Sequence, residues 1–254
     1  MNRLKFAIQY LPMKRNSVVL LALACLVTIF SFTLISKKKV NNVGPVAVKA
    51  ETPATTFDVY DSLHLHALGL NKTVFDLAVQ GYKHLIECGK LKKTNVISIV
   101  DFSLPSTAKR LFIVDVEHYK LLFNTYVSHG RNSGLQNASS FSNEPESFKS
   151  SLGFYTTAST YSGKHGYSMQ LEGLEKGFND KAMSRGIVMH AASYVDESIA
   201  KAQGYIGRSL GCPAVPEKLH TAIIGAIANG SCLFMYANDN NYLQHSSFLQ
   251  NNKS

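Results

Sequence analysis

A cysteine between a glycine and a proline is the residue in this chain whose setting most suggests chemistry. Cys212 lies in the run RSLGCPAV, residues 208–215. A nucleophilic cysteine needs a base that removes its proton, a turn that exposes its sulfur, and hydrogen-bond donors for the oxyanion that its attack creates. Gly211 allows a close backbone approach, so the successive amides of Gly211 and Cys212 are candidate donors. A metal ligand, half of a disulfide and a small apolar turn residue are the alternatives.

A candidate base lies upstream of the cysteine. The apolar run GIVM at 186–189 predicts a buried strand, and His190 follows it directly. A histidine at the end of a buried strand is held rigidly and can take a proton near neutral pH. The spacing alone leaves catalysis open, because a cysteine and a histidine occur together in most proteins of this size. It does disfavour a zinc site, since His129, His165, His190 and Cys212 lack the tight spacing of common zinc motifs.

The cysteine count constrains the state of these thiols. Of the 4 cysteines, Cys88, Cys212 and Cys232 follow the apolar N-terminal segment. In an oxidising compartment an odd number leaves at least one thiol unpaired. A disulfide between Cys88 and Cys232 stays open at this point, and so does the alternative that both are buried thiols.

The apolar N-terminal segment predicts a membrane anchor. Residues 16–36 (NSVVLLALACLVTIFSFTLIS) carry no charge over about 20 residues, the length that an α-helix needs to cross a bilayer. Basic residues precede the segment, and it is longer than the apolar core of a typical cleavable signal peptide. We therefore expect residues 1–36 to form a signal anchor, with a cleaved signal peptide as the alternative. The large domain that follows is expected to be exported.

The charge distribution argues against a nucleic-acid partner. The chain has 26 Lys and Arg against 17 Asp and Glu, a formal net charge of +9. Seven of the basic residues lie before residue 40, whereas every acidic residue lies at or after Glu51. The other 19 basic residues are nearly balanced by the 17 acidic ones. The basic excess therefore belongs to the N-terminal tail and is not the basic patch of a nucleic-acid-binding domain.

The elements that must position these residues are mostly strands. Residues 37–57 mix Lys, Asn, Gly, Pro and Thr without apolar periodicity and predict a linker, whereas residues 58–93 have the apolar spacing of a helical segment. Runs rich in β-branched and aromatic residues predict strands at 95–102, 110–116, 121–127, 154–157, 167–171, 186–189 and 232–236. Short helices are expected at 196–203 and 219–228. The domain at 94–237 is therefore predicted to be mostly β with a few helices, an α+β class.

Two polar stretches interrupt or follow this pattern. Residues 129–151 are rich in Ser, Asn and Gly, and they predict a surface loop that is too polar for the core. Residues 238–254 are rich in Asn, Gln and Ser and predict a disordered tail.

Several stretches together carry a family resemblance. They are the run from His190 to Ser209-Leu210-Gly211-Cys212 and the longer segments DFSLPSTAKRLFIVDV, VSHGRNSG, FSNEPESFKSSLGFYTT, SRGIVMHAASYV and GSCLFMY. In order and style they resemble the L,D-transpeptidase (YkuD-type) catalytic domain family, in its murein L,D-transpeptidase branch. The resemblance covers roughly residues 94–236. It implies a β-sandwich catalytic domain preceded by the helical segment.

The resemblance also implies roles for individual residues. Cys212 would be the nucleophile and His190 the base and later the acid, while the amides of Gly211 and Cys212 would form the oxyanion hole. Cys212 would take the acyl group of a peptidoglycan stem tetrapeptide, release D-alanine, and pass the acyl group to an amine to form a crosslink. No metal or organic cofactor is implied. Stem peptides and carbapenem β-lactams are the implied partners, and the bacterial cell envelope is the implied location.

Four further residues are weaker candidates. Ser209 is expected to support the turn by hydrogen bonding, and Tyr155 stands where the family often has an aromatic residue near the donor groove. His165 and Arg185 could bind the carboxylates of a stem peptide, although for Arg185 an ion pair with Asp180 is the favoured interpretation.

The chain also departs from the family pattern. Leu210 replaces a second histidine, Pro213-Ala214 replaces the usual pair after the cysteine, and Ala191 stands where a glycine often follows the histidine. These departures leave open how substrate carboxylates are held. An L,D-carboxypeptidase, with water as the acceptor, and a non-catalytic wall-binding module are the alternative functions.

Overall fold

The structure is a computed structural model that describes residues 56–250, with side chains from residue 59 onward. The expected anchor (1–36) and nearly all of the expected linker (37–57) lie outside the described residues. Within residues 56–250, no helix is both long and apolar enough to cross a bilayer.

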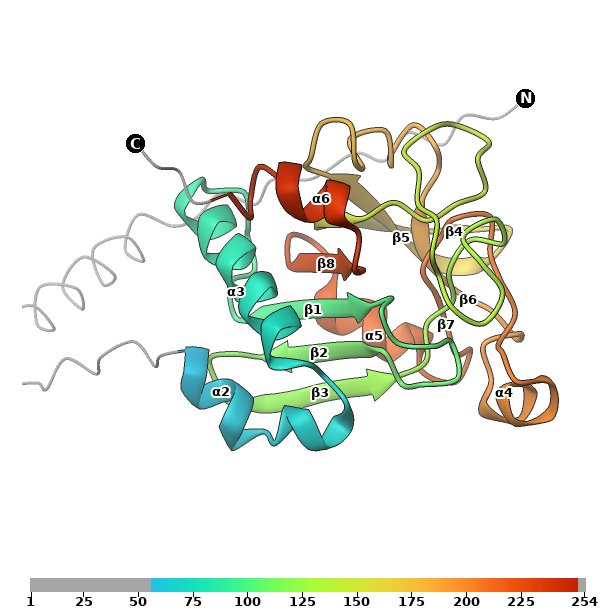
Figure 1. Cartoon of the computed structure of the whole chain (residues 1–254), viewed down its shortest axis with the longest axis horizontal. Helices are drawn as coiled ribbons and strands as arrows, with labels where there is room; N and C mark the ends of the chain where they lie inside the picture. Colours follow the sequence, from blue (N-terminus) through green and yellow to red (C-terminus); the bar gives the residue numbers. More distant parts are fainter. Residues whose placement is uncertain (1–55, 251–254) are drawn as a thin grey trace, which may run out of the picture. The chain divides into compact units, whose positions relative to one another are not determined.

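Helices open the described chain, as the spacing of apolar residues predicts (Figure 1). They are α2 (Thr56–Ser62), the 3-10 helix η1 (Leu65–Leu68) and α3 (Lys72–Glu87). Asn71 caps α3 by accepting a hydrogen bond from the Thr73 amide at 2.8 Å, which satisfies one of the free N–H groups at a helix start. The apolar faces of these helices join the same core cluster as the strands, so residues 58–93 are packed into the domain that follows.

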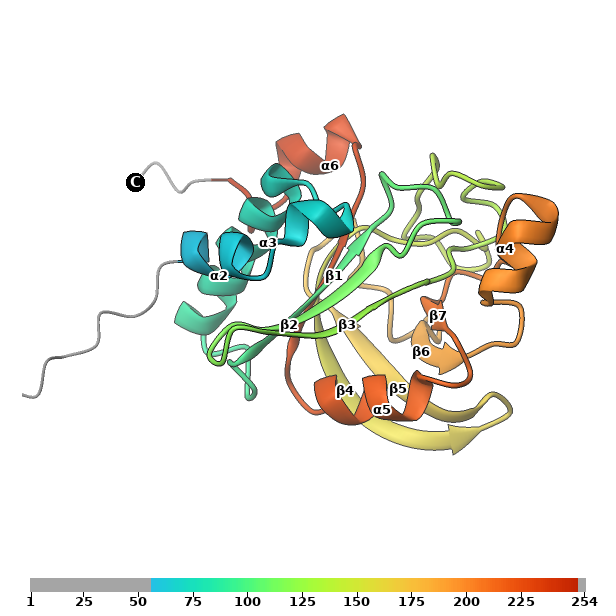
Figure 2. The same cartoon turned by 90° about the horizontal axis from the view of Figure 1, so that it is seen from below.

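The strands form one eight-stranded sheet in the order β3-β2-β1-β8-β4-β5-β6-β7. Their bounds are β1 Val96–Asp101, β2 Leu111–Asp115, β3 Lys120–Thr125, β4 Gly153–Gly163, β5 Gly166–Gly173, β6 Val188–Ala191, β7 Ala214–Val215 and β8 Cys232–Tyr236. The pairs β1–β8 and β6–β7 are parallel, and the remaining pairs are antiparallel. The sheet curves strongly, so β4 and β5 bend away from β1, β2 and β3 (Figure 2). The predicted class, mostly β with a few helices, is confirmed.

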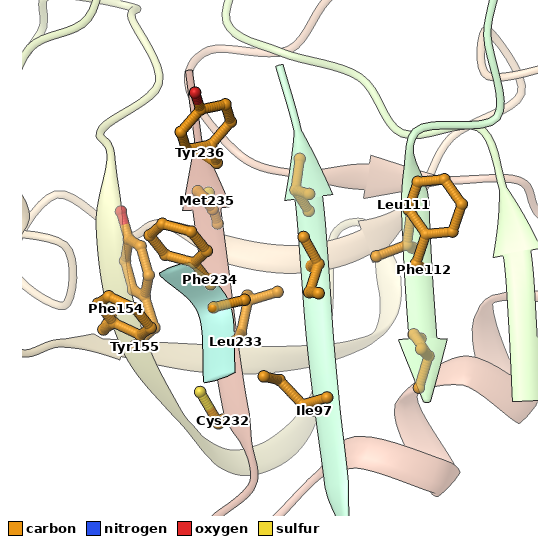
Figure 3. Close-up of a cluster of buried hydrophobic side chains, with 14 of the residues drawn as sticks. Ile97, Leu111, Phe112, Phe154, Tyr155, Cys232, Leu233, Phe234, Met235 and Tyr236 are labelled. Atoms are coloured by element: carbon orange, nitrogen blue, oxygen red, sulfur yellow. The ribbon is translucent and has the colours of Figure 1, made fainter. Parts of the chain in front are cut away.

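The core lies along β8, at the centre of the sheet. Phe234 of β8 stacks on Phe154 of β4 with ring centroids 4.2 Å apart, and Ile97 of β1 stands opposite Cys232 of β8 in the same cluster (Figure 3). Helix α3 covers this region through Gly81, where an added Cβ would stand 2.0 Å from the Phe154 ring. On the other side of the sheet, α5 (His220–Ile227) packs against β5 and β6 (Figure 2).

The described cysteines form no disulfide with one another. Cys88 is exposed at the end of α3, whereas Cys232 is fully buried in β8 (Figure 3). All three described cysteines are free thiols. Burial raises the pKa of Cys232 far above its ordinary value, so this thiol is an apolar core group. Cys212 is only half-buried.

The prediction of a disordered tail is wrong for residues 238–250. Helix α6 (Asn240–His245) lies there, and Asp239 caps it by accepting from the Tyr242 amide at 2.8 Å. The Tyr242 side chain is buried, and its hydroxyl donates to the Glu175 carboxylate at 2.9 Å. That carboxylate also accepts from the Phe154 amide at 2.7 Å. One buried aromatic residue and one buried acceptor thus fix a stretch whose composition is mostly polar.

The polar stretch 129–151 is likewise not confined to the surface. His129, Ser133 and Ser150 are all buried. Their polar atoms are hydrogen-bonded: the Ser150 amide donates to the Ser133 hydroxyl at 2.9 Å, the Gly130 amide donates to the Ser150 hydroxyl at 3.0 Å, and Nδ1 of His129 accepts from Arg110. Buried polar groups are tolerated when they are hydrogen-bonded in this way. The expectation that composition keeps this loop out of the core is therefore wrong.

Candidate active site

Two short parallel strands bring Cys212 and His190 together. In the β6–β7 register His190 stands opposite Ala214, and Cys212 lies two residues before that position. The Val188 amide donates to the Cys212 sulfur at 3.5 Å, and the sulfur lies 3.7 Å from the Gly186 carbonyl oxygen. Both side chains line one cavity of about 560 Å³. The structure thus places the predicted nucleophile and the predicted base in one cavity.

His190 is arranged to act as a base. Its Nδ1 lies 2.8 Å from the Ala191 carbonyl oxygen. Because a carbonyl only accepts, Nδ1 carries the proton and Nε2 keeps its lone pair. Burial lowers the pKa of His190, the nearby His165 lowers it further, and the hydrogen bond to Ala191 opposes both. The imidazole is therefore kept neutral, the form that can take a proton.

His165 reaches the site from the hairpin between β4 and β5. Its ring stacks on that of His190, with centroids 4.5 Å apart and planes 25° apart. His165 is exposed on its other side. The structure therefore places this predicted site residue directly against the base.

The Cys212 thiol is protonated in the resting protein. Burial raises its pKa, while the Val188 amide and the charge of Arg185 partly offset this. Among the described residues, the sulfur and the His190 ring are not hydrogen-bonded to each other. Catalytic hydrogen bonds are often longer in the free enzyme than in its complexes. A protonated thiol needs a base before it can act as a nucleophile, and His190 is the predicted base in the same cavity.

Ser209 supports the turn that carries the cysteine. Its hydroxyl donates to the Cys212 carbonyl at 2.6 Å and accepts from the Gly211 amide at 3.0 Å. Gly211 has φ +125, a conformation that side-chain-bearing residues rarely adopt. An added Cβ there would stand 2.8 Å from the Lys149 carbonyl oxygen. Both the glycine and the serine are therefore required by the shape of this turn.

The same hydrogen bonds correct the predicted oxyanion hole. The Gly211 amide is already bonded to the Ser209 hydroxyl, so it is not free to bind an oxyanion in this structure. The Cys212 amide has no hydrogen-bond acceptor among residues 56–250. Of the two predicted donors, only the Cys212 amide is available.

Arg185 does not pair with Asp180, so the favoured interpretation of this residue is wrong. Its guanidinium donates instead to acceptors in the stretch 142–151: Ser142 O at 2.8 Å, Ser151 Oγ at 3.1 Å, Ser147 Oγ at 3.2 Å and Lys149 O at 2.7 Å. Asp180 accepts from Asn143 and from the Gly177 amide. Arg185 also lines the cavity, and its charge lowers the pKa of Cys212. It thus fastens a loop to the wall of the site.

Tyr155 is a core residue and does not line the cavity. Its side chain is fully buried, and its hydroxyl lies 3.0 Å from both the backbone and hydroxyl oxygens of Ser151. Burial raises its pKa far above the ordinary value. The prediction that it lies near a substrate groove is wrong, because β4 turns this residue toward the core (Figure 3).

Other residues that line the cavity were not among the predicted site residues. Tyr194 lies on the wall of the cavity. Burial raises the pKa of its phenol, and the charge of a Cys212 thiolate would raise that pKa further. Tyr161 and Lys164 come from the β4–β5 hairpin, and the exposed Arg208 precedes the cysteine turn. Leu210 also lines the cavity and is 55% exposed.

The charged residues known to line the cavity are basic. Lys164, Arg185 and Arg208 line it, and no acidic residue does so among those described. Nor does any group of three or more His, Cys, Asp or Glu residues within the described chain lie close enough to hold a metal ion. The site thus combines a thiol, a neutral imidazole and cationic walls, which suits attack on the carbonyl group of an anionic substrate.

Comparison with known proteins gives a family match. Residues 66–236 match the family model described as L,D-transpeptidase catalytic domain. No curated protein matches the chain.

Several solved L,D-transpeptidases are similar at low identity. One from Mycobacterium smegmatis has 12% identity and a TM-score of 0.36, with 56% of this chain and 59% of that chain covered. One from Stackebrandtia nassauensis has 16% identity and a TM-score of 0.35, with 67% and 69% covered. L,D-transpeptidase 3 from Mycobacterium tuberculosis, in complex with a faropenem-derived adduct, has 14% identity and a TM-score of 0.36, with 56% and 60% covered. The chain thus spans less than two thirds of the mycobacterial chains.

Proposed function

The chain belongs to the L,D-transpeptidase catalytic domain family, and on this premise we propose that it is a peptidoglycan L,D-transpeptidase that acts through Cys212. The observation that carries the proposal is the shared cavity of Cys212 and His190, with the imidazole held in the tautomer that leaves Nε2 free. A non-catalytic wall-binding module would have no need of that arrangement.

In the first step, Nε2 of His190 takes the proton from the Cys212 thiol as the sulfur attacks the carbonyl carbon of an L,D-peptide bond in a stem tetrapeptide. The carbonyl oxygen becomes an oxyanion, for which the Cys212 amide is the available donor in the resting turn. The C–N bond then breaks, and the His190 proton passes to the leaving nitrogen. D-alanine departs, and a thioester links the acyl group to Cys212.

In the second step, an amine of a neighbouring stem peptide attacks the thioester. His190 Nε2 takes a proton from the amine, the C–S bond breaks, and the sulfur regains a proton from His190. A new amide bond crosslinks the two stems. Water in place of the amine would give a carboxypeptidase, so the choice of acceptor decides between two outcomes of one chemistry.

The charges on the cavity wall support an anionic donor. Lys164 and Arg208 are exposed cations beside the thiol and the imidazole. Stem peptides carry free carboxylates, with which such side chains form charge-assisted hydrogen bonds. We assign the donor carboxylates to these two residues, because both terminal nitrogens of Arg185 are bonded to the 142–151 loop. Toward the described part of the chain, Arg208 uses only Nη1, for the carbonyls of Arg131 and Gly134.

The proposal extends to inhibition and to location. Carbapenems present a strained carbonyl that a thiolate opens, so we expect them to acylate Cys212 and remain attached. Stem peptides lie outside the cytoplasmic membrane, which agrees with the expected export of the domain and its attachment through the N-terminal segment.

Incubation of the full chain with tetrapeptide-rich peptidoglycan, followed by mass spectrometry of the muropeptides, tests the function. Crosslinked dimers together with D-alanine release are the expected products, and Cys212→Ser should abolish both. Tripeptides without dimers would identify a carboxypeptidase instead. Unchanged muropeptides would contradict the proposal and favour the wall-binding module.

A further inference from the structure

A buried arginine directly before β2 holds the stretch that follows β3. Arg110 is fully buried, and its Nε and Nη2 donate to the Val127 carbonyl oxygen at 3.1 and 3.0 Å. Its Nη1 donates to the Leu104 carbonyl at 3.0 Å, and Nη2 also lies 2.7 Å from Nδ1 of His129. A buried guanidinium is costly unless its donors are used. Here all three nitrogens are used, and two of them hold one backbone carbonyl.

His129 continues this network toward the turn. Its Nε2 lies 3.2 Å from the Gly134 carbonyl oxygen, so Nε2 carries the proton and Nδ1 accepts from Arg110. Burial lowers the pKa of His129 to about 4, and the Arg110 charge contributes to the shift. The ring is fully buried and packs edge-on against Phe102, which also lies beneath the Arg110 guanidinium. His129 is thus a neutral, orientated link between Arg110 and the loop.

The backbone of 128–131 holds the segment that carries the nucleophile at both ends. On the upstream side, the Ser209 amide donates to the His129 carbonyl at 3.0 Å, and the Arg131 amide donates to the Ser209 carbonyl at 2.8 Å. On the downstream side, the Ser128 amide donates to the Ala214 carbonyl at 2.9 Å, and the Ala214 amide donates to the Ser128 hydroxyl at 3.2 Å. Cys212 lies between these two attachments.

A third attachment reaches the glycine beside the nucleophile. The Ser150 hydroxyl accepts from the Gly130 amide at 3.0 Å and donates to the Gly211 carbonyl at 3.2 Å. Stretch 128–131 lies in no regular strand, and an isolated bridge pairs Gly130 with Ser209. Its own position therefore depends on side-chain hydrogen bonds, among them those of Arg110, His129 and Ser150.

We propose that Arg110 and His129 are positioning residues for the acyl transfer: through the backbone of 128–131 they hold the turn that aims the Cys212 sulfur. This inference rests on the proposed function for its kinetic consequence, whereas its structural content is independent of it. Neither residue lines the cavity with Cys212, so neither touches the substrate. A misplaced sulfur slows the chemical step, while substrate binding on the cavity wall is unaffected.

Substitutions at His129 in the full chain test the proposal. His129→Leu removes both ring hydrogen bonds, whereas His129→Asn keeps an acceptor near the position of Nδ1 for Arg110. Val79→Ala, a truncation on α3 away from the cavity, is the control for general loss of stability. The readouts are kcat and KM for D-alanine release from a stem tetrapeptide, the thermal midpoint, and amide hydrogen exchange at Arg131 and Ser209.

We expect His129→Leu to lower kcat by about tenfold or more with little change in KM, because small displacements of reacting atoms cost large factors in rate. His129→Asn should recover part of the rate. Exchange at Arg131 and Ser209 should accelerate in His129→Leu but not in Val79→Ala.

Two results would overturn the inference. One is a kcat in His129→Leu no lower than in Val79→Ala once their thermal midpoints are matched, and the other is unchanged exchange at both amides. If the wild-type chain releases no D-alanine, the proposed function fails by itself. In that case faster exchange in His129→Leu alone would still support the link from His129 to the turn, and equal exchange would overturn it.

Discussion

The hydroxyl group of Ser209 bonds two backbone groups of the turn around Cys212, so Ser209→Ala is an informative perturbation. Ser209 is 5% exposed and serves both the Gly211 amide and the Cys212 carbonyl. Its removal leaves two backbone groups without partners in a buried or half-buried turn. Each such loss costs about 1 to 3 kcal/mol, so the free energy of unfolding should fall by about 2 to 6 kcal/mol. For a domain of this size the thermal midpoint should then fall by about 4 to 24 °C.

Urea unfolding, followed by circular dichroism, measures this loss, and Ser184→Ala is the matched control. The Ser184 hydroxyl also bonds a backbone carbonyl, that of Lys181 at 2.9 Å, but Ser184 is exposed. Water can replace that bond, so the control should change stability by less than about 0.5 kcal/mol. The Ser209 variant should also acylate more slowly, because its turn is loosened. Equal stability of the two variants, with an unchanged acylation rate in Ser209→Ala, would refute this account of the turn.

Three further predictions concern the turn and its two histidines. Gly211→Ala should destabilise the protein and slow acylation, because φ at this position is +125 and an added Cβ would stand 2.8 Å from a backbone oxygen. Gly225→Ala in α5 is the control: its Cβ meets open space, and the change should stabilise the protein by up to about 1 kcal/mol. Thermal unfolding compares the two variants, and equal shifts of the thermal midpoint would contradict the strain at Gly211. His165→Ala should raise the pKa of His190, since His165 lowers that pKa and covers the His190 ring. The acid limb of the pH profile of the acylation rate should therefore move to higher pH. An acid limb that stays in place or moves to lower pH would contradict the contact. The pKa of His129 falls from 6.5 to about 4 on folding, so its contribution to stability is complete above pH 6.5 and is lost as the pH falls toward 4. Between pH 7 and pH 4.5 the wild type should therefore lose about 2 to 3 kcal/mol more than His129→Asn, measured by urea unfolding, and equal losses would show that His129 is not buried in the neutral form.

The strands and the main helices were predictable because their apolar residues recur at the spacing of regular structure. The runs around β1, β2 and β8 are almost wholly buried, and such runs predict strands without further information. Helix α6 was not predictable in this way, because it is short and polar and is fixed by the contact of Tyr242 with Glu175. These two residues lie 67 positions apart in the chain, and no local pattern connects them.

The residues of the candidate site differ in the same way in how far the sequence predicts them. Cys212 and His190 could be predicted as a candidate pair from residue type and order, because a nucleophile and its base must have particular side chains, and the structure places both in one cavity. Apart from Ser209, the support of the site was not predicted: Arg110 and His129 bond backbone carbonyls, which every residue carries. For Arg185 and Tyr155 the sequence predicted wrong surroundings, since their partners are set by how the 142–151 loop and β4 fold. Residue type identifies reacting groups, whereas the groups that hold them depend on contacts between distant parts of the chain.

The central claim is that Cys212 is the nucleophile and that His190 activates it. The most direct test is mass spectrometry of the full chain after incubation with a carbapenem, followed by mapping of the modified peptide. The account predicts a gain equal to the mass of the intact drug, located on Cys212, absent in Cys212→Ser and formed much more slowly in His190→Ala. An adduct elsewhere in the chain, no adduct on the folded wild type, or an unchanged rate in His190→Ala would contradict it.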